Sequence, residues 1–182
     1  METSIIISGF GGQGVLLAGQ LLAYAGMDAG KNVTWIPSYG PEMRGGTAHC
    51  VVIISDDVIG APIVNRPDIA IVLNQPSYDK YEKIVKPGGL LVVNTSLIDV
   101  NPTRDDIEVV EVAANAIAEE WGTPKMMNMA ALGALLSTRP VLPLEVVKQA
   151  LVDHLPATKQ HLVEANLKVI THAAQITMPV KS

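Results

Sequence analysis

The segment that most restricts the fold lies near the amino terminus, where a β-branched run leads directly into a glycine-rich turn. Residues 4–8 read Ser-Ile-Ile-Ile-Ser, which is typical of a short buried strand. Gly9, Gly11 and Gly14 follow with G-x-G-x-x-G spacing. An apolar helical pattern then covers residues 13–29. A strand, a glycine turn and a helix in this order predict the first unit of a nucleotide-binding type of α/β sheet, with free N–H groups that bind an anion at the start of the helix.

The acidic residue that a dinucleotide enzyme requires is missing. Such an enzyme places Asp or Glu about 20 residues further on, at the end of the second strand, where it binds a ribose hydroxyl. Here residues 32–36 form the predicted second strand, and Pro37 and Ser38 follow it. Asp28 comes too early, on the preceding helix, and Glu42 lies beyond the strand in a loop. The pattern disfavours NAD or FAD binding and leaves a stand-alone nucleotide-binding enzyme as the alternative function.

The rest of the chain alternates β-branched runs with helical patterns, which is typical of a mostly parallel sheet covered on both faces. We expect an α/β fold with a single doubly wound, mostly parallel, Rossmann-like sheet, helices on both faces and a helical carboxyl-terminal region, forming one domain over residues 1–182. Further strands are expected at 48–55, 68–74, 90–94 and 108–112, with a short antiparallel piece at 58–64. Further helices are expected at 75–85, 113–121, 127–137, 143–154 and 157–176.

Composition excludes several classes of function. The single cysteine, Cys50, rules out an internal disulfide and an iron–sulfur cluster held by four cysteines, and it suits a reducing compartment. No basic signal segment and no apolar run of about 18 residues is present, so we expect a cytoplasmic protein without membrane contact. The net charge of −5, with scattered lysines and arginines, argues against nucleic-acid binding. Only 17% of residues are charged and the mean hydropathy is +0.30, which indicates that partner subunits cover part of the surface.

The side chains that usually carry chemistry give no independent site. Cys50 is expected to be a buried structural thiol, and its neighbour His49 must point to the opposite face of the strand, so the two cannot chelate one ion. His161 and His172 are 11 residues apart, about 16 Å along a helix, so we predict no metal site. The methionines of segment 126–129 are expected in the core or at an interface. No Gly-x-Ser-x-Gly elbow supports a serine hydrolase.

A second motif follows the second predicted strand, where residues 38–46 read Ser-Tyr-Gly-Pro-Glu-Met-Arg-Gly-Gly. Together with Gly-Phe-Gly-Gly-Gln-Gly-Val at 9–15, this loop resembles the gamma subunit of 2-oxoacid:ferredoxin oxidoreductases, and the resemblance covers most of the chain. The form of residues 38–50 is most similar to the 2-oxoglutarate enzymes, whereas pyruvate enzymes carry a phenylalanine and a different tail in this loop. The supporting pieces are Pro67-Asp68, Tyr78 to Tyr81, Lys86-Pro87-Gly88-Gly89 and Asn128-Met129.

The resemblance implies a multisubunit enzyme that oxidatively decarboxylates a 2-oxoacid, transfers the acyl group to coenzyme A and passes two electrons to ferredoxin. Its partners would be alpha, beta and ferredoxin-like delta subunits. Thiamine diphosphate, Mg²⁺ and iron–sulfur clusters would belong to those subunits, and coenzyme A would bind in the complex. The resemblance therefore implies that this chain has no catalytic residue, binds no cofactor or metal alone and is inactive by itself.

We expect the glycine turn and the loop at 38–46 to converge at one edge of the sheet, because the first two strands of a doubly wound sheet are normally neighbours. An anion there would meet the helix dipole, free N–H groups and the guanidinium of Arg44. That anion is a coenzyme A phosphate, a thiamine phosphate or a partner's carboxylate; alternatively, Arg44 pairs with Glu42 or a partner residue and only fixes the loop. The expected contact residues are Gly9, Gly11, Gly12, Gln13, Gly14, Ser38, Tyr39, Arg44, Gly45 and Gly46.

Overall fold

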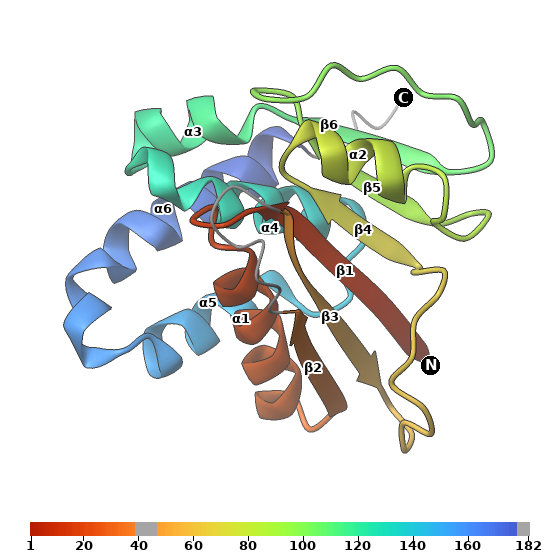
Figure 1. The fold of residues 1–182 in the computed structure, drawn as a ribbon. Helices are drawn as coiled ribbons and strands as arrows, with labels where there is room; N and C mark the ends of the chain where they lie inside the picture. The colour runs from red at the N-terminus through yellow and green to blue at the C-terminus, as the bar shows by residue number, and fades with distance from the viewer. Residues whose placement is uncertain (39–46, 178–182) are drawn as a thin grey trace.

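The computed structural model describes residues 1–38 and 47–177, which form a six-stranded mixed sheet with helices on both faces (Figure 1). The strand order is β2-β3-β1-β4-β5-β6. The strands are β1 (Glu2–Phe10), β2 (Asn32–Ser38), β3 (Thr47–Ser55), β4 (Ile69–Val72), β5 (Leu90–Asn94) and β6 (Glu108–Val112). The α-helices are α1 (Val15–Asp28), α2 (Gln75–Tyr81), α3 (Ala114–Trp121), α4 (Met127–Thr138), α5 (Leu144–His154) and α6 (Val163–Ile176), and two 3-10 helices are η1 (Pro124–Met126) and η2 (Ala157–Leu162).

The α/β fold class is confirmed, but the position of the second strand is not the expected one. β1, β4, β5 and β6 run parallel to one another, while β3 is antiparallel to both β1 and β2. The expectation that the first two strands are neighbours is wrong, because β3 lies between them. Burial explains this order: β3 is buried along most of its length and suits an interior position, whereas no residue of β2 is fully buried, which suits an edge.

Two hydrophobic layers cover the two faces of the sheet. On one face the strands pack against α1 and the helical carboxyl-terminal region, with α4 buried almost all round between the sheet and α6. On the other face α2 packs over the central strands, and Tyr78 and Tyr81 are its buried anchors. Figure 1 shows α2 alone on its side, opposite the larger group of helices. Helices on both faces were expected from the alternating pattern, and this arrangement confirms them.

Two local expectations need correction. Residues 58–64 form no strand: Val58 and Ile63 are 86% and 77% exposed, and Gly60 and Pro62 interrupt the segment, so it has neither the burial nor the donors for a ladder. The expected helix at 157–176 is two elements, since η2 precedes α6. None of the described helices is both long and apolar enough to cross a membrane.

Candidate anion-binding cleft

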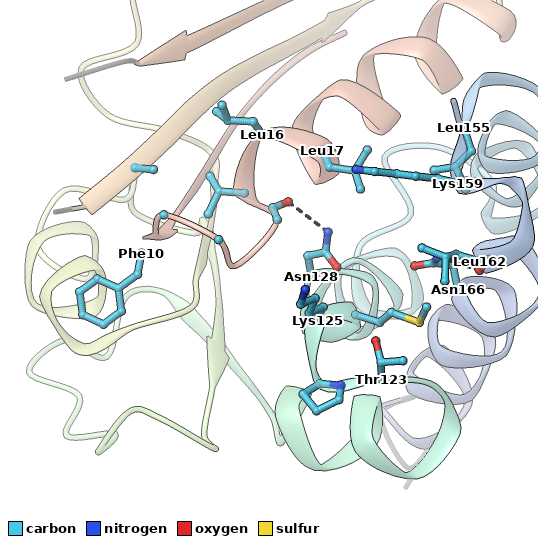
Figure 2. A pocket seen from close by; sticks show the side chains of 17 residues that line it. Phe10, Leu16, Leu17, Thr123, Lys125, Asn128, Leu155, Lys159, Leu162 and Asn166 are labelled. Carbon is cyan, nitrogen blue, oxygen red and sulfur yellow. Dashed lines mark hydrogen bonds between the residues drawn. The ribbon is translucent and has the colours of Figure 1, made fainter. Parts of the chain in front are cut away.

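A cleft of about 820 Å³ lies at the carboxyl end of β1 (Figure 2). One wall is the turn between β1 and α1 together with the first turn of α1, and the opposite wall comes from η1, η2 and α6. The described residues that line it are Phe10, Gly11, Gly12, Gly14, Val15, Leu16, Leu17, Ala48, Thr123, Pro124, Lys125, Met126, Asn128, Leu155, Lys159, Leu162 and Asn166. The cleft therefore lies at the predicted glycine turn, and its far wall comes from residues more than a hundred positions later.

The glycine turn has a backbone that only glycine adopts without strain. Gly12 and Gly14 have φ angles of 91° and 74°, in the left-handed region that disfavours residues with a side chain. Gly14 is also the N-cap of α1, and the Asn128 side chain occupies the space where a Cβ of residue 14 would lie. The Asn128 amide donates a hydrogen bond to the Gly14 carbonyl at 3.1 Å, the bond drawn in Figure 2. The start of α4 thus fixes the turn that begins α1.

The buried side chain of Gln13 stabilises the turn through two hydrogen bonds. Its Oε1 accepts a hydrogen bond from the Phe10 N–H at 2.6 Å, and its Nε2 donates to the Leu73 carbonyl at 3.3 Å. The residue is only 7% exposed. Its side chain therefore ties the turn to the end of β4 instead of facing the cleft, which leaves backbone groups as the ligand-facing part of the turn.

The amino-terminal end of α1 carries a partial positive charge that no side chain of the described residues neutralises. The N–H groups that open an α-helix have no partner within the helix and give this end a partial positive charge. In the described part of the chain, no side chain caps this end and no acidic residue lies in its first turn. Lys125 and Lys159 line the same cleft, and in Figure 2 the Lys159 side chain extends from η2 toward the start of α1. Helix dipole, open N–H groups and two ammonium groups together favour an anion such as a phosphate.

The remainder of the cleft is apolar. Leucine and methionine side chains cover much of its surface, and they come from both walls. Asn166, which is 6% exposed, donates from its Nδ2 to the Leu162 carbonyl at 2.8 Å, and no described residue donates to its side-chain oxygen. A cleft with one cationic region and an apolar wall suits an elongated ligand that carries both an anionic group and an uncharged chain. The apolar residues are Leu16, Leu17, Met126, Leu155 and Leu162.

The predicted site residues are only partly placed together. Gly9, Gly11, Gly12, Gln13 and Gly14 form one turn beside the cleft, and Ala48, which pairs with Gly9, also lines it. Ser38 lies at the end of β2 opposite His49, one strand removed from β1. Tyr39, Arg44, Gly45 and Gly46 lie outside the described residues, so their convergence with the turn stays a prediction.

The topology also bears on the dinucleotide alternative. In that type of site the acidic residue lies at the end of the strand next to β1. Here β3 separates β2 from β1, and β2 ends in Ser38. The end of β2 therefore lacks the acidic side chain that binds ribose, and β2 is not the strand next to β1.

Sequence reasoning missed Lys125, Lys159 and Asn166. Each is an isolated polar residue on a helical segment more than a hundred positions after the glycine turn, and no spacing links it to the motif. Only the packing of η1, η2 and α6 against the start of α1 places these residues at the cleft.

Cys50 and the methionines at 126, 127 and 129 are buried, as expected. Cys50 is fully buried against α1, and burial raises the pKa of its thiol to about 12. His49 is half-buried on the opposite face, where burial, and then the nearby Lys80, lowers its pKa. The methionines at 126, 127 and 129 are at most 9% exposed and belong to the core, and Met126 also lines the cleft. Among the described residues, no cluster of three or more His, Cys, Asp or Glu side chains is arranged to hold a metal ion.

The chain matches a known protein family and is similar to known enzyme subunits. A family model described as pyruvate ferredoxin/flavodoxin oxidoreductase matches residues 4–176. The chain is 36% identical over 174 residues to the ketoisovalerate oxidoreductase subunit VorA of Methanothermobacter marburgensis, a match that covers 95% of this chain and 36% of VorA. It is 37% identical over 159 residues to the 2-oxoglutarate synthase subunit KorC of Methanocaldococcus jannaschii, covering 86% of this chain and 85% of KorC. The chain thus spans about a third of VorA but most of KorC.

A solved structure shares the fold over its full length. The gamma subunit of a keto/oxoacid ferredoxin oxidoreductase from Geobacter sulfurreducens PCA superposes with a TM-score of 0.79 at 30% identity. The match covers 96% of this chain and 99% of that subunit. The resemblance drawn from the glycine turn and the loop at 38–46 is therefore confirmed.

Proposed function

Because the chain belongs to the pyruvate ferredoxin/flavodoxin oxidoreductase family, we propose that it is the gamma-type subunit of a multisubunit 2-oxoacid:ferredoxin oxidoreductase. Its partners are alpha, beta and ferredoxin-like delta subunits, and ferredoxin accepts the electrons. Thiamine diphosphate, Mg²⁺ and the iron–sulfur clusters belong to those partners, an assignment that the single buried cysteine of this chain supports. The same cysteine usage supports a cytoplasmic location.

The proposed reaction converts 2-oxoglutarate, coenzyme A and two oxidised ferredoxins into succinyl-CoA, CO2, two reduced ferredoxins and one proton. The bond between the 2-oxoacid carboxylate and its keto carbon breaks, a thioester forms at that carbon, and the two electrons released go to ferredoxin. Similarity to KorC, together with the sequence at 38–50, supports 2-oxoglutarate. The similarity to VorA supports a branched-chain 2-oxoacid as the second candidate. Assaying the purified complex with each 2-oxoacid at equal concentration distinguishes the two.

Within that complex, the cleft of this chain binds the phosphate-bearing part of coenzyme A. The observation that carries this assignment is the uncapped start of α1, which faces the same cleft as Lys125 and Lys159. The apolar wall then accepts the uncharged arm of the coenzyme, and Asn166 supplies an acceptor for an amide N–H of that arm. Arg44 and its loop either contribute to this contact or dock a neighbouring subunit.

Steady-state kinetics of the assembled complex test the coenzyme site. In the Lys125→Ala/Lys159→Ala double variant, the KM for coenzyme A should rise about tenfold or more, because charge-assisted hydrogen bonds are lost, while kcat at saturation changes little. The matched control is Lys168→Ala, which removes an exposed α6 lysine paired with Glu164 outside the cleft. A KM for coenzyme A that is equal in the double variant and the control would refute the assignment.

The Arg44→Ala variant separates the two roles of the loop at 38–46. A raised KM for coenzyme A with the complex intact assigns Arg44 to ligand binding. Loss of a subunit from the purified complex assigns it to docking instead. The readout is subunit stoichiometry by native mass spectrometry beside the coenzyme A saturation curve.

A further inference from the structure

Asn128 connects the glycine turn to the helical wall of the cleft. It lies in the first turn of α4, is 3% exposed and lines the cleft (Figure 2). Its Nδ2 donates to the Gly14 carbonyl at 3.1 Å, and its Oδ1 accepts from the Met129 N–H at 2.9 Å. Exchanging the two amide atoms would set acceptor against acceptor and donor against donor. The side chain therefore has one orientation, with its donor directed at Gly14.

The Gly14 carbonyl accepts two hydrogen bonds. The Ala18 N–H donates to it at 3.0 Å, as the first bond of the α1 ladder, and the Asn128 amide donates to it from outside the helix. A peptide unit is planar and trans, so the Gly14 carbonyl and the Val15 N–H point in opposite directions and turn together. Glycine allows this unit many orientations because it has no Cβ. The bond from Asn128 therefore restricts the direction of the Val15 N–H.

This N–H belongs to the end of α1 that faces the cleft. Val15 is the first residue of α1 and lines the cleft. The opening N–H groups of a helix have no partner inside it and are available to a ligand. A donor that is already held in the bound direction costs little reorganisation when an anion arrives. A donor whose direction is preset therefore binds an anion more tightly than one that is free to turn.

The same contact anchors the segment that carries a cleft lysine. Lys125 lies three positions before Asn128, on η1, which leads directly into α4. Both residues line the cleft. Because the Asn128 amide is bonded to the Gly14 carbonyl, this segment is tied to the glycine turn next to the lysine. Loss of the bond would release both the peptide unit before Val15 and the wall that holds the ammonium group.

We infer that Asn128 is a positioning residue of the anion site: it orients the Val15 N–H and keeps Lys125 near the glycine turn, without itself contacting the anion. The inference rests on the proposed function, because the anion in question is the phosphate-bearing part of coenzyme A. It goes further by making the affinity for the coenzyme depend on a buried side chain of α4.

Steady-state kinetics of the assembled complex provide the first test. Asn128→Asp keeps the size of the side chain but replaces the donor with a carboxylate, which repels the Gly14 carbonyl and a bound phosphate. A carboxylate in the first turn suits the dipole of α4, so the variant should fold. The KM for coenzyme A should rise about tenfold or more, while kcat at saturation stays within about twofold. The control is Asn101→Asp, which adds the same charge on an exposed loop outside the cleft and should leave this KM unchanged.

Amide spectroscopy of the full chain separates positioning from direct contact. Inorganic pyrophosphate is the anion probe, and it is titrated into isotope-labelled wild type and Asn128→Ala. The Val15 amide resonance should shift in Asn128→Ala before any probe is added, and pyrophosphate should bind about fivefold more weakly or worse. Weaker binding with an unshifted Val15 amide would make Asn128 a direct ligand and overturn the inference. A wild-type chain that binds no pyrophosphate would overturn it as well.

The lysine double variant keeps two failures distinguishable. If Lys125→Ala/Lys159→Ala raises the KM for coenzyme A and Asn128→Asp does not, the inference fails and the proposed coenzyme site stands. If neither variant changes this KM, both fail. Circular dichroism and thermal melting show whether each variant is folded, so a raised KM is not mistaken for loss of the fold.

Discussion

The conformation of the glycine turn is set by a few side chains far apart in the sequence. Gly14 combines a left-handed backbone with direct contact to Asn128, and the Gln13 side chain links the Phe10 N–H of the turn to the Leu73 carbonyl after β4. The motif alone predicts the need for glycine at position 14. It does not predict Asn128, because that residue meets the turn only through tertiary packing.

Gly14→Ala should therefore destabilise the chain. The backbone conformation alone costs about 1–2 kcal/mol for a residue with a Cβ, and the overlap with the Asn128 side chain adds to this. Gly60→Ala is the matched control, since no atom lies within 4 Å of the new Cβ. Urea unfolding of both variants checks the prediction. Equal midpoints for the two would show that Asn128 moves away without cost and that the turn tolerates a side chain.

Among single residues, buried ones were predictable and the cleft lysines were not. The β-branched neighbours of Cys50 indicated a buried strand, and the thiol is buried. Lys125 and Lys159 have no comparable local signal, because a lysine on a helix is most often a solvated surface residue. Their position at the cleft depends on how the helices pack.

At the scale of secondary-structure elements, Asp68 joins three of them at the amino-terminal edge of the sheet. Its carboxylate accepts hydrogen bonds from the Ser4 N–H and hydroxyl on β1, at 2.8 and 2.6 Å, just before β4 begins. It also pairs with Lys86, at 2.8 Å, in the turn that leads to β5. Burial alone would raise the pKa of Asp68, but the hydrogen bonds from Lys86 and Ser4 outweigh it and hold the pKa below its ordinary value of 3.8.

This contact should make stability depend on pH in the acid range. The pKa of Asp68 is lower in the folded chain than in the unfolded chain. The stabilisation from this contact is therefore fully present above the unfolded-state pKa and is lost as the pH falls through the folded-state pKa. We expect the unfolding free energy to decrease as the pH drops below about 4 and to decrease less in Asp68→Asn, which cannot titrate. Asp105→Asn, an exposed loop carboxylate, is the control. Parallel pH profiles for wild type and Asp68→Asn would contradict the role given to Asp68.

The strands and helices themselves were largely predictable, but their arrangement was not. The runs at 90–94 and 108–112 coincide with β5 and β6, because strand signals are local. The insertion of β3 between β1 and β2 depends on long-range pairing and on the low burial of β2, which local patterns do not report. Local patterns also predict a strand at 58–64. That prediction is wrong, because the apolar residues of this segment are exposed rather than paired.

In the whole molecule, the cleft depends on segments that are far apart in the sequence. One wall is the glycine turn with the start of α1, and the opposite wall comes from η1, η2 and α6. Phe10 lines the cleft and is exposed at the end of β1. The proposed coenzyme contact therefore requires the packed fold and is not a property of the glycine turn alone.

We propose that this chain is a required subunit of a coenzyme A-dependent 2-oxoacid:ferredoxin oxidoreductase. The most direct measurement is ferredoxin reduction by the partner subunits with 2-oxoglutarate and coenzyme A, before and after this chain is added in stoichiometric amount. We expect little ferredoxin reduction without the chain and full activity after its addition, with none from the chain alone. Equal turnover in its absence, or NAD reduction by the isolated chain, would show that the chain is not a required subunit of such an enzyme.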